Sequence, residues 1–481
     1  MLFNSYEFIF IYLPLVMLIY FSLGRFYPAI LPRLFLLTAS LFFYGWWQYE
    51  YLFLIISSII LNFILIKKIN ISHKSIAKKY LLLGVALNVL VLMYFKYIDF
   101  LFKNMSFFLE DTTESFNIAL PLAISFFTFQ QIACLVDSYR KTENQTLLDY
   151  AIFVTFFSQL IAGPIVHHSQ MMPQIKSKLN LMMNFENILN GLLIFSLGLA
   201  KKVLIADSLR IWANQGFTSS ASLSFYEAWG ASLSYSFQLY FDFSGYTDMA
   251  LGSALLFNIK LPVNFNSPYK SRNIQEFWRR WHITLGRFLR DYVYIPLGGG
   301  RVSEYKVCRN LMVTFLLGGI WHGAAWTFVF WGFLHGLGLI VHRKWSQFMP
   351  SFPHFISWFL TFNFVNITWV FFRAKTWKEA GNVLSAMFSS DFDINTRVIN
   401  SFTFWDQNGI NLGKWVSEIV NGSDCLSWVL LSLLAVTATR NSVELANKYG
   451  DKTWFITYAS FIFSLSIVNM SKITEFLYFN F

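Results

Sequence analysis

Residues 318–336 read GGIWHGAAWTFVFWGFLHG and contain no Asp, Glu, Lys or Arg. About 20 mostly apolar residues are needed to cross the hydrocarbon core of a bilayer as a helix. His322 and His335 lie inside this run. Ionisable groups are costly at membrane depth, so they are candidates for function there. The stretch therefore predicts a membrane segment that carries chemistry.

The composition of the whole chain agrees with this segment. Of 481 residues, 56% are hydrophobic and 20% aromatic, whereas 13% are charged. Soluble domains carry roughly 25% charged residues. The composition excludes disordered, collagen-like and coiled-coil proteins. The three cysteines show neither disulfide nor metal spacing, which argues against disulfide scaffolds and zinc modules. We predict an all-α polytopic membrane protein.

Many further runs are apolar enough to form membrane helices. With the central segment they cover residues 6–24, 30–47, 50–66, 80–97, 118–136, 150–165, 186–204, 227–257, 310–326, 327–342, 355–373, 426–439 and 454–470. Several are short or interrupted, so we expect about ten to twelve transmembrane helices with re-entrant and interfacial helices beside them. Helices are expected because backbone groups in lipid must be paired internally. One membrane domain, 1–481, is predicted, and its first helix is not a removed signal peptide.

The charges of the loops indicate an orientation. Residues 67–79 contain five lysines and no acid, whereas residues 98–117 contain four acids and one lysine. Cytoplasmic loops are rich in Lys and Arg. We therefore expect residues 67–79 inside, residues 374–425 as an external loop, and both termini outside. The net charge of +11 is then explained by cytoplasmic loops rather than by nucleic-acid binding.

Residues 258–309 interrupt the apolar pattern with bases and aromatic residues. From about Asn273 to Asp291 the spacing predicts one helix, apolar on one face and rich in arginine on the rest. Such a helix lies in a membrane interface, here on the cytoplasmic side. The pattern fits a positive-inside anchor, and it also fits a surface for an anionic donor such as a CoA thioester. The candidates for holding its phosphates are Lys270, Arg272, Arg279 and Arg280.

Two histidines are the main candidates for chemistry. A neutral imidazole at His322 can take a proton from an attacking hydroxyl. The alternative is a packing histidine bonded to a neighbouring helix. His282, in the basic segment, is the second candidate, and its alternative is an interfacial histidine among arginines.

Two carboxylates, Asp242 and Asp248, lie in the apolar run QLYFDFSGYTDMALGSALLF, residues 238–257. At membrane depth they would hold a metal, relay protons, cap a broken helix, or form a buried structural network, which is the commonest outcome. The compact ligand set of a catalytic zinc site is missing, so no metal is predicted.

Three long strings resemble the membrane-bound O-acyltransferase family: residues 161–174 (IAGPIVHHSQMMPQ), residues 238–301 and residues 316–336. The resemblance points to the branch of the bacterial alginate O-acetyltransferase, and extends to peptidoglycan O-acetyltransferase and teichoic acid D-alanyl transfer proteins. It implies a funnel of helices with a thin floor, and acyl transfer from a cytoplasmic thioester to an external acceptor. The family's catalytic histidine falls on His322, and its second motif residue falls on His282.

The chain ends with FLYFNF, residues 476–481. This tail, residues 471–481, is similar at its end to the small partner peptide of teichoic acid D-alanylation systems. The resemblance implies that Tyr478 carries the acyl group. An aromatic anchor in the membrane interface is the alternative.

The predicted function is that of a membrane-bound O-acetyltransferase in the bacterial cytoplasmic membrane. Acetyl-CoA is the expected donor, no bound cofactor is expected, and the surroundings are membrane lipid without nucleic acid. An extracytoplasmic serine esterase-like (SGNH-type) acetyltransferase is the expected partner, and the acceptors are hydroxyls of an alginate- or peptidoglycan-type polysaccharide. The alternatives are D-alanyl transfer to teichoic acid and polymer or lipid transport. No pair of matching interrupted helices recurs in the two halves, which disfavours a transporter.

Overall fold

The computed structural model describes residues 1–46, 48–109, 118–141, 145–161, 163–218, 223–350, 352–391, 405–406, 409–410, 424–470 and 477. Helices dominate the described chain. They are accompanied by one antiparallel pair of two-residue strands, β1 (Trp405–Asp406) and β2 (Gly409–Ile410). The predicted all-α class is confirmed.

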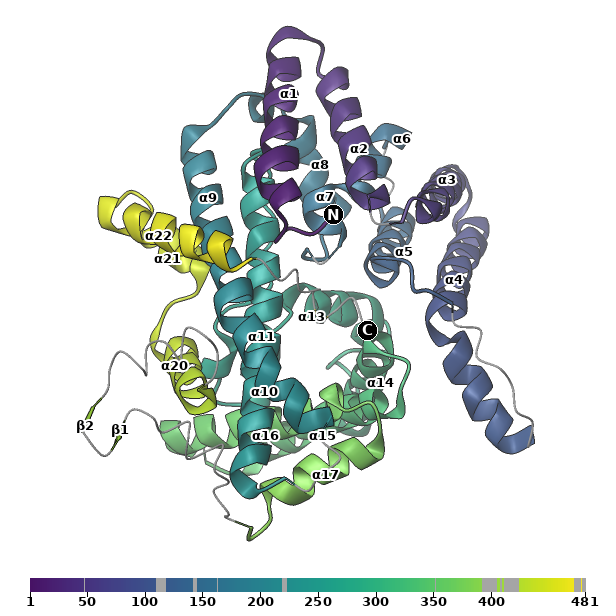
Figure 1. Ribbon diagram of the computed structural model, residues 1–481. Coiled ribbons are helices and arrows are strands. Elements are labelled where there is room, and N and C mark those ends of the chain that lie inside the picture. Colours follow the sequence, from purple (N-terminus) through teal and green to yellow (C-terminus); the bar gives the residue numbers. More distant parts are fainter. Residues whose placement is uncertain are drawn as a thin grey trace.

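The first part of the chain forms two neighbouring groups of helices (Figure 1). Helix α1 packs beside α2, and α3, α4 and α5 pack together next to them. The elements are η1 (Glu7–Tyr12), α1 (Leu13–Phe26), α2 (Ile30–Gly45), α3 (Glu50–Ile71), α4 (Lys74–Leu109), α5 (Ile124–Arg140), α6 (Leu147–Thr155), α7 (Phe157–Leu160) and α8 (His168–Lys176).

A long buried helix, α11 (Phe225–Leu255), runs through the middle of the molecule. Its N-terminus is fixed by a capping box, in which Ser224 and Glu227 satisfy each other's backbone N–H groups. Every residue from 234 to 254 is buried. The helix packs against the preceding elements α9 (Phe185–Ala200), η3 (Lys201–Ala206) and α10 (Asp207–Thr218), most extensively α9 and α10. The short element η2 (Lys178–Leu181) precedes them and contacts α1 and α8.

Helices α9 and α11 touch through glycines. A Cβ atom added to Gly198 would lie 2.6 Å from the carbonyl oxygen of Gly245, and one added to Gly252 would lie 2.6 Å from that of Gly191. Small residues that let two backbones approach are typical of helix pairs in membranes. No side chain fits at these positions, so the glycines set the distance between the two helices.

The elements of the second half of the chain lie on both sides of α11 and toward its lower end in Figure 1. Its elements are η4 (Pro268–Lys270), α12 (Ile274–Arg280), α13 (Ile283–Leu289), η5 (Arg290–Tyr294), α14 (Glu304–His322), α15 (Trp326–Phe348), α16 (His354–Arg373), α17 (Trp377–Met387), α20 (Cys425–Ala438), α21 (Ser442–Tyr449) and α22 (Thr453–Asn469). The predicted loop 374–425 thus begins with a helix, α17, and the indole of Trp229 donates to the carbonyl of its Met387 at 2.9 Å.

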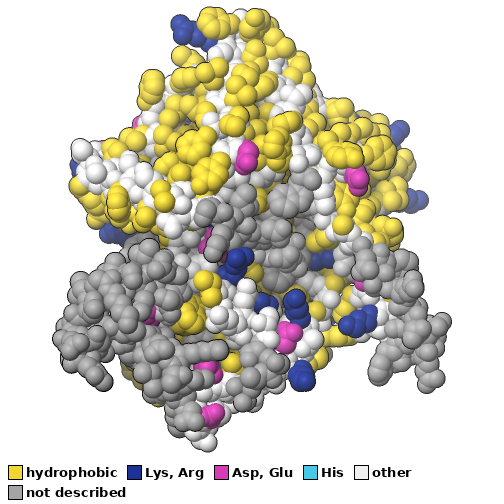
Figure 2. Space-filling model, in the orientation of Figure 1, with side chains coloured by type: hydrophobic (Ala, Val, Ile, Leu, Met, Phe, Trp, Pro, Cys, Tyr) yellow, Lys and Arg dark blue, Asp and Glu magenta, His cyan; other side chains and the backbone are white. Residues whose placement is uncertain are grey.

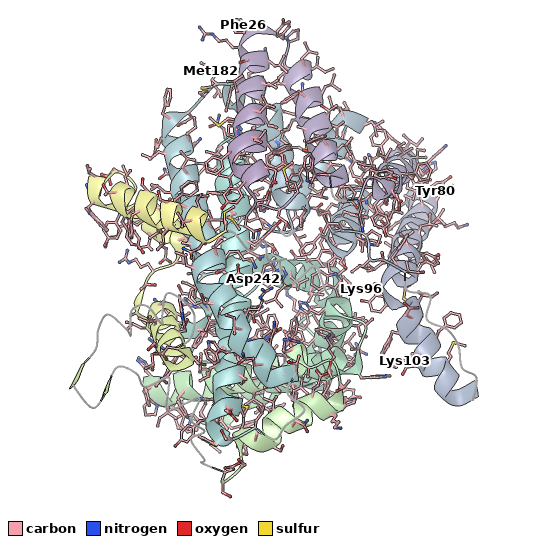
Figure 3. The ribbon with its side chains drawn as sticks, in the orientation of Figure 1. Phe26, Tyr80, Lys96, Lys103, Met182 and Asp242 are labelled. Atoms are coloured by element: carbon pink, nitrogen blue, oxygen red, sulfur yellow. The ribbon has the colours of Figure 1, made fainter. Side chains whose placement is uncertain are left out.

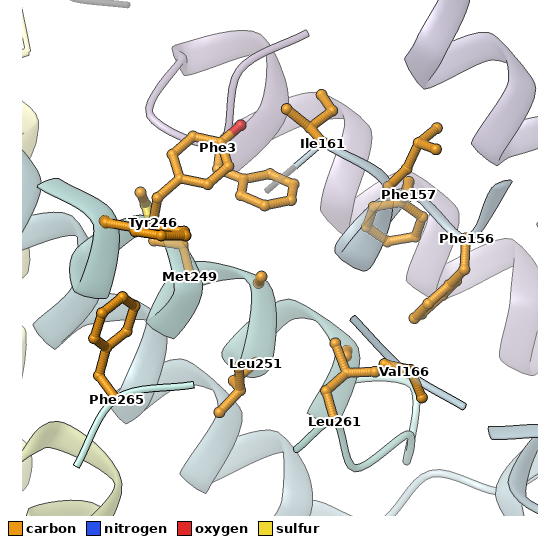
Figure 4. Packing of buried hydrophobic residues seen from close by; sticks show 14 of the residues in the cluster. Phe3, Phe156, Phe157, Ile161, Val166, Tyr246, Met249, Leu251, Leu261 and Phe265 are labelled. Carbon is orange, nitrogen blue, oxygen red and sulfur yellow. The ribbon is translucent and has the colours of Figure 1, made fainter. Parts of the chain in front are cut away.

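One continuous core joins the two halves, and a smaller cluster lies beside it. Figure 4 shows part of this core, where Phe3 near the N-terminus stacks on Tyr246 of α11 with ring centroids 4.8 Å apart. Aromatic pairs of this kind add to the stabilisation gained by burial. Figure 2 shows apolar side chains over much of the surface, with Lys, Arg, Asp and Glu gathered mainly on the lower part of this face.

Five helical segments are long and apolar enough to cross a membrane: Glu7–Phe26, Glu50–Ile71, Lys74–Met105, Phe185–Thr218 and His354–Arg373. The bent pair α20 and α21, which meet at 59°, would make a sixth. The other expected spans within the described residues form shorter, broken or more polar helices. The number of segments that meet these criteria is therefore smaller than the ten to twelve spans we expected from hydropathy.

The predicted single helix from Asn273 to Asp291 is wrong. Helix α12 ends at Arg280, α13 begins at Ile283, and His282 between them has a left-handed backbone with φ of +44°. The apolar face that we assigned to the membrane interface is instead buried in protein, because Phe277 and Trp281 are each 1% exposed. The chain turns after this segment at Gly298 and Gly299, which both have positive φ.

Candidate active site

His322 is the last residue of α14 and is 3% exposed. The chain turns sharply after it, since Gly323 is extended and α15 begins at Trp326. Helices α14 and α15 lie close enough that a Cβ added to Gly319 would be 3.1 Å from the Cα of Gly332. This tight hairpin fixes the imidazole at a helix end inside the protein.

Aromatic rings surround the imidazole of His322. Its ring centroid lies 4.9 Å from that of Trp321, 5.0 Å from that of Trp331 and 5.0 Å from that of Phe372. The rings of Trp331 and Phe372 meet it edge to face. Such surroundings exclude bulk water, and a proton transfer there is governed by the few polar groups present.

Lys96 is a cation whose contacts reach this site, and the sequence did not single it out. Its Nζ donates to the carbonyl of Trp321 at 2.6 Å, to the carbonyl of His322 at 3.2 Å and to Oγ of Ser125 at 3.3 Å. An ammonium group has three N–H donors, so these contacts use all of them. The last carbonyls of a helix lack intrahelical partners and favour a cation. Lys96 therefore fixes the end of α14 at the candidate base.

Lys96 lies at the end of the expected span 80–97, and for this reason the sequence did not mark it as a site residue. A lysine at the end of an apolar run is typical of a membrane boundary. Helix α4 in fact continues to Leu109, so Lys96 lies well inside it. Figure 3 places Lys96 near the middle of the molecule, far from Phe26 and Met182 at one end.

His282 is fully buried, with 0% exposure, which rules out the interfacial alternative. Its Nδ1 lies 3.2 Å from Oδ1 of Asn264. The backbone N–H of Thr284 donates to the same oxygen at 3.1 Å, and a backbone N–H cannot accept, so this atom of Asn264 must be the oxygen. Nδ1 of His282 therefore carries the proton, and Nε2 presents a lone pair.

Nε2 of His282 is buried, and no polar atom of the described residues bonds to it. Buried polar atoms in native proteins are nearly always paired, so this nitrogen is available to a group that enters the site. Trp321 links the two candidate histidines, because its ring lies 6.2 Å from that of His282 and 4.9 Å from that of His322.

His335, in contrast, has both ring nitrogens in use. The indole of Trp278 donates to Nδ1 at 3.2 Å, and Nε2 lies 3.0 Å from Oγ1 of Thr368. That hydroxyl gives its own proton to the carbonyl of Val365, so it accepts from Nε2. His335 is a structural histidine that joins α12, α15 and α16.

The four candidate cations do not converge on one point. Lys270 donates to the carbonyl of Thr439, and Arg280 pairs with Glu276 at 2.9 Å. Arg279 is exposed, and Arg272 turns toward His354 on α16, with 3.1 Å between Nη1 and Nε2. They form a broad cationic edge rather than a compact phosphate site.

Asp242 and Asp248 lie in buried ion pairs with the π-helical turn η3. Lys202 reaches Asp242 at 2.6 Å and Asp207 at 3.0 Å, and Lys201 reaches Asp248 at 2.7 Å. Of the alternatives given for the two carboxylates, the structure thus shows the buried structural network. Within the described residues, no three His, Cys, Asp or Glu side chains come together as a metal site.

Tyr478 lies outside the described residues, but its neighbour Leu477 is placed. The backbone N–H of Leu477 donates to Oδ2 of Asp242 at 2.9 Å. Asp242 is buried on α11 and lies near the middle of the molecule in Figure 3. One point of the C-terminal tail is therefore attached to the central helix.

Comparisons with known proteins identify the family of this chain. The model of the membrane-bound O-acyltransferase family matches residues 143–376, which include both candidate histidines. The chain is 45% identical to the peptidoglycan O-acetyltransferase of Helicobacter pylori over 516 residues, covering 100% of this chain and 98% of the relative.

Two further relatives are more distant. The probable alginate O-acetylase AlgI of Pseudomonas aeruginosa is 39% identical over 399 residues, covering 81% of this chain and 75% of the relative. The teichoic acid D-alanyltransferase of Streptococcus thermophilus is 29% identical over 246 residues, covering 47% and 57%. The chain is a multi-pass membrane acyltransferase and belongs to the membrane-bound O-acyltransferase family.

Proposed function

We propose that the chain transfers an acetyl group from cytoplasmic acetyl-CoA to an acceptor hydroxyl that lies beside His322. The acetyl group then passes from this hydroxyl to a cell-surface polysaccharide. The observation that carries the proposal is a buried imidazole at a helix end whose backbone is fixed by Lys96. Relatives named for O-acetyl transfer, one of them similar along its whole length, support the acetyl group.

The chemistry assigned to His322 is general base catalysis. The hydroxyl oxygen attacks the thioester carbonyl as its proton moves to the imidazole. The carbon–sulfur bond then breaks, and the proton passes from the imidazole to the CoA thiolate. Proton transfer of this kind contributes about 10²–10⁴-fold. Positioning of donor and acceptor supplies much of the remaining acceleration.

His282 is assigned to orienting the donor. Its Nε2 lone pair can accept a hydrogen bond from an amide or hydroxyl that enters the site. Stabilisation of developing negative charge by His282 would need an N–H at Nε2, which this tautomer does not provide. The proposed role is therefore to hold a donor group beside Trp321.

The cationic edge, apart from Arg272, is assigned to attracting the phosphates of CoA. Lys270, Arg279 and Arg280 lie in or just before α12, in the segment expected on the cytoplasmic side. Their divergent side chains fit electrostatic attraction better than a single bidentate clamp. Arg272 turns away from them toward His354 on α16 and is left out of this assignment.

The tail is assigned to carrying the acetyl group outward. Leu477 is bound to Asp242 on α11, and Tyr478 is the next residue in the chain. In this proposal its hydroxyl accepts acetyl from the donor and releases it to an extracytoplasmic SGNH-type transferase. Trapping the reaction and measuring the mass of the C-terminal peptide tests this step. An acetyl adduct on Tyr478 that disappears in Tyr478→Phe supports it, and an unmodified peptide contradicts it.

The acceptor polymer is proposed to be peptidoglycan. The full-length similarity to a peptidoglycan O-acetyltransferase favours it over alginate, for which the similarity covers 81% of this chain. Muropeptide analysis of a strain lacking the protein tests this choice. Loss of O-acetyl groups from muropeptides is expected, and unchanged muropeptides together with a deacetylated exopolysaccharide would point to an alginate-type acceptor.

A further inference from the structure

A groove of about 720 Å³ lies between α15, α16 and the start of α12. Neither His322 nor His282 lines it. Its volume falls within the range of about 300–1,000 Å³ that is typical of small-molecule sites. Acyl transfer as described above does not use this space.

Apolar side chains form the walls of the groove. Leu337 and Val341 of α15 face Leu360 and Phe364 of α16 across it. The two helices meet closely at Gly338, where an added Cβ would lie 2.9 Å from the ring of Phe364. The groove extends from this contact toward the turn of the hairpin, where Trp345 stacks on Phe352 with centroids 5.2 Å apart.

A cation lies at the polar end of the groove. Arg272 is exposed, and its guanidinium donates to Nε2 of His354, which must be unprotonated to accept. None of the residues that line the groove is Asp or Glu. The nearby carboxylate of Glu276 accepts from the backbone N–H of Arg272 but pairs its charge with Arg280. The charge of Arg272 therefore has no carboxylate partner in the groove.

The polar end lies where lipid headgroups are expected. Helix α16 is one of the five apolar segments long enough to cross a membrane, and it begins at His354, next to Arg272. An anionic head on Arg272 would thus place an attached acyl chain along α16, against Leu360 and Phe364. Tryptophans such as Trp345 are typical of this boundary.

We propose that the groove binds one anionic glycerophospholipid of the surrounding membrane, with its phosphate on Arg272 and an acyl chain between α15 and α16. Guanidinium groups bind phosphates through paired N–H donors. A lipid of zero net charge would fill the walls but leave the charge of Arg272 unbalanced. The site is independent of the acyl-transfer proposal, because no residue of that mechanism lines it.

Native mass spectrometry of the full-length protein, titrated with palmitoyl-oleoyl phosphatidylglycerol or phosphatidylcholine, tests the proposal. Wild type should bind one phosphatidylglycerol more tightly than phosphatidylcholine. Arg272→Gln should weaken phosphatidylglycerol binding about tenfold, as expected for the loss of a hydrogen bond to a charged group. Lys344→Gln is the matched control, because it removes an exposed α15 cation that does not line the groove.

Equal affinities of wild type and Arg272→Gln would overturn the proposal, and so would an equal loss in Lys344→Gln. A second variant, Leu360→Trp, fills the wall and keeps the cation, so it covers the case in which Arg272→Gln does not fold. It should also lose the bound lipid. Inorganic phosphate should not displace the lipid completely, even at phosphate concentrations that saturate the contact with Arg272. Complete displacement would show that the apolar walls contribute nothing, contrary to the proposal.

Discussion

The ammonium group of Lys96 lies 2.6 Å from the carbonyl oxygen of Trp321, the residue that precedes the candidate base. The two residues are 225 positions apart in the chain, one on α4 and the other on α14. A contact between these helices thus holds the end of α14, and with it the imidazole of His322. The position of the base depends on a helix outside the matched family region, residues 143–376.

Removing this cation should slow the chemical step. Lys96→Met leaves the carbonyls of Trp321 and His322 without their donor, at a cost of about 1.5–3 kcal/mol for a hydrogen bond to a charged group. We expect kcat for acetyl transfer to fall about tenfold or more, with a smaller change in KM for acetyl-CoA. Lys96→Arg keeps the charge and should retain more activity. Lys103→Met, seven positions along α4, is the control, and an equal loss in that variant would argue for a general effect on the helix.

The two buried histidines His282 and His335 should respond differently to truncation. His335→Ala leaves the Trp278 indole and the Thr368 hydroxyl without their partner, so it should lower stability by about 1–3 kcal/mol. His282→Ala removes the free Nε2 and should raise KM for acetyl-CoA. Thermal unfolding and steady-state kinetics separate these outcomes. A normal KM in His282→Ala would reject its assigned role.

The buried pair between Lys202 and Asp242 allows a double-mutant test of the tail contact. Asp242→Leu alone leaves a buried lysine short of one partner, and breaking such a pair costs about 3–5 kcal/mol. Adding Lys202→Met should recover part of that stability. Because Leu477 still lacks its acceptor, transfer activity should stay low in the double variant. Recovery of both stability and activity would show that the tail contact is dispensable.

The glycine contact between α9 and α11 should tolerate no side chain. Gly198→Ala places its Cβ 2.6 Å from the carbonyl oxygen of Gly245, which forces the helices apart. Overpacking of this kind costs about 1–3 kcal/mol. Gly381→Ala on α17 is the control, because a Cβ there meets nothing within 4 Å and helix propensity should favour Ala by about 1 kcal/mol. Thermal unfolding of both variants in the same detergent checks this prediction. Equal unfolding temperatures would contradict this packing of α9 against α11.

The sequence predicts the helical class and most helix positions because apolar runs of this length have few other solutions. It also singles out His322, since an imidazole between apolar runs is conspicuous. The break at His282 was missed because the spacing of apolar residues continues across it. A single residue with a left-handed backbone conformation does not change the spacing of apolar residues along the sequence.

Lys96 was missed for a related reason. A lone lysine near the end of an apolar run looks like a membrane boundary, and its partners are carbonyl groups of a distant helix. For the candidate cations the error of the sequence-based prediction is the opposite one, because residues expected to share a site do not. They are close in sequence, but Arg272 and Arg280 turn to different neighbours once α12 is packed. Proximity along the chain does not establish a shared site.

The central claim is that the imidazole of His322 is the general base for acetyl transfer. Its most direct test is CoA release from acetyl-CoA by the full-length protein in proteoliposomes with its partner, compared between wild type and His322→Ala. The account predicts a rate at least about 10²-fold lower in the variant, with unchanged thermal unfolding. A folded His322→Ala protein with the wild-type rate would contradict it.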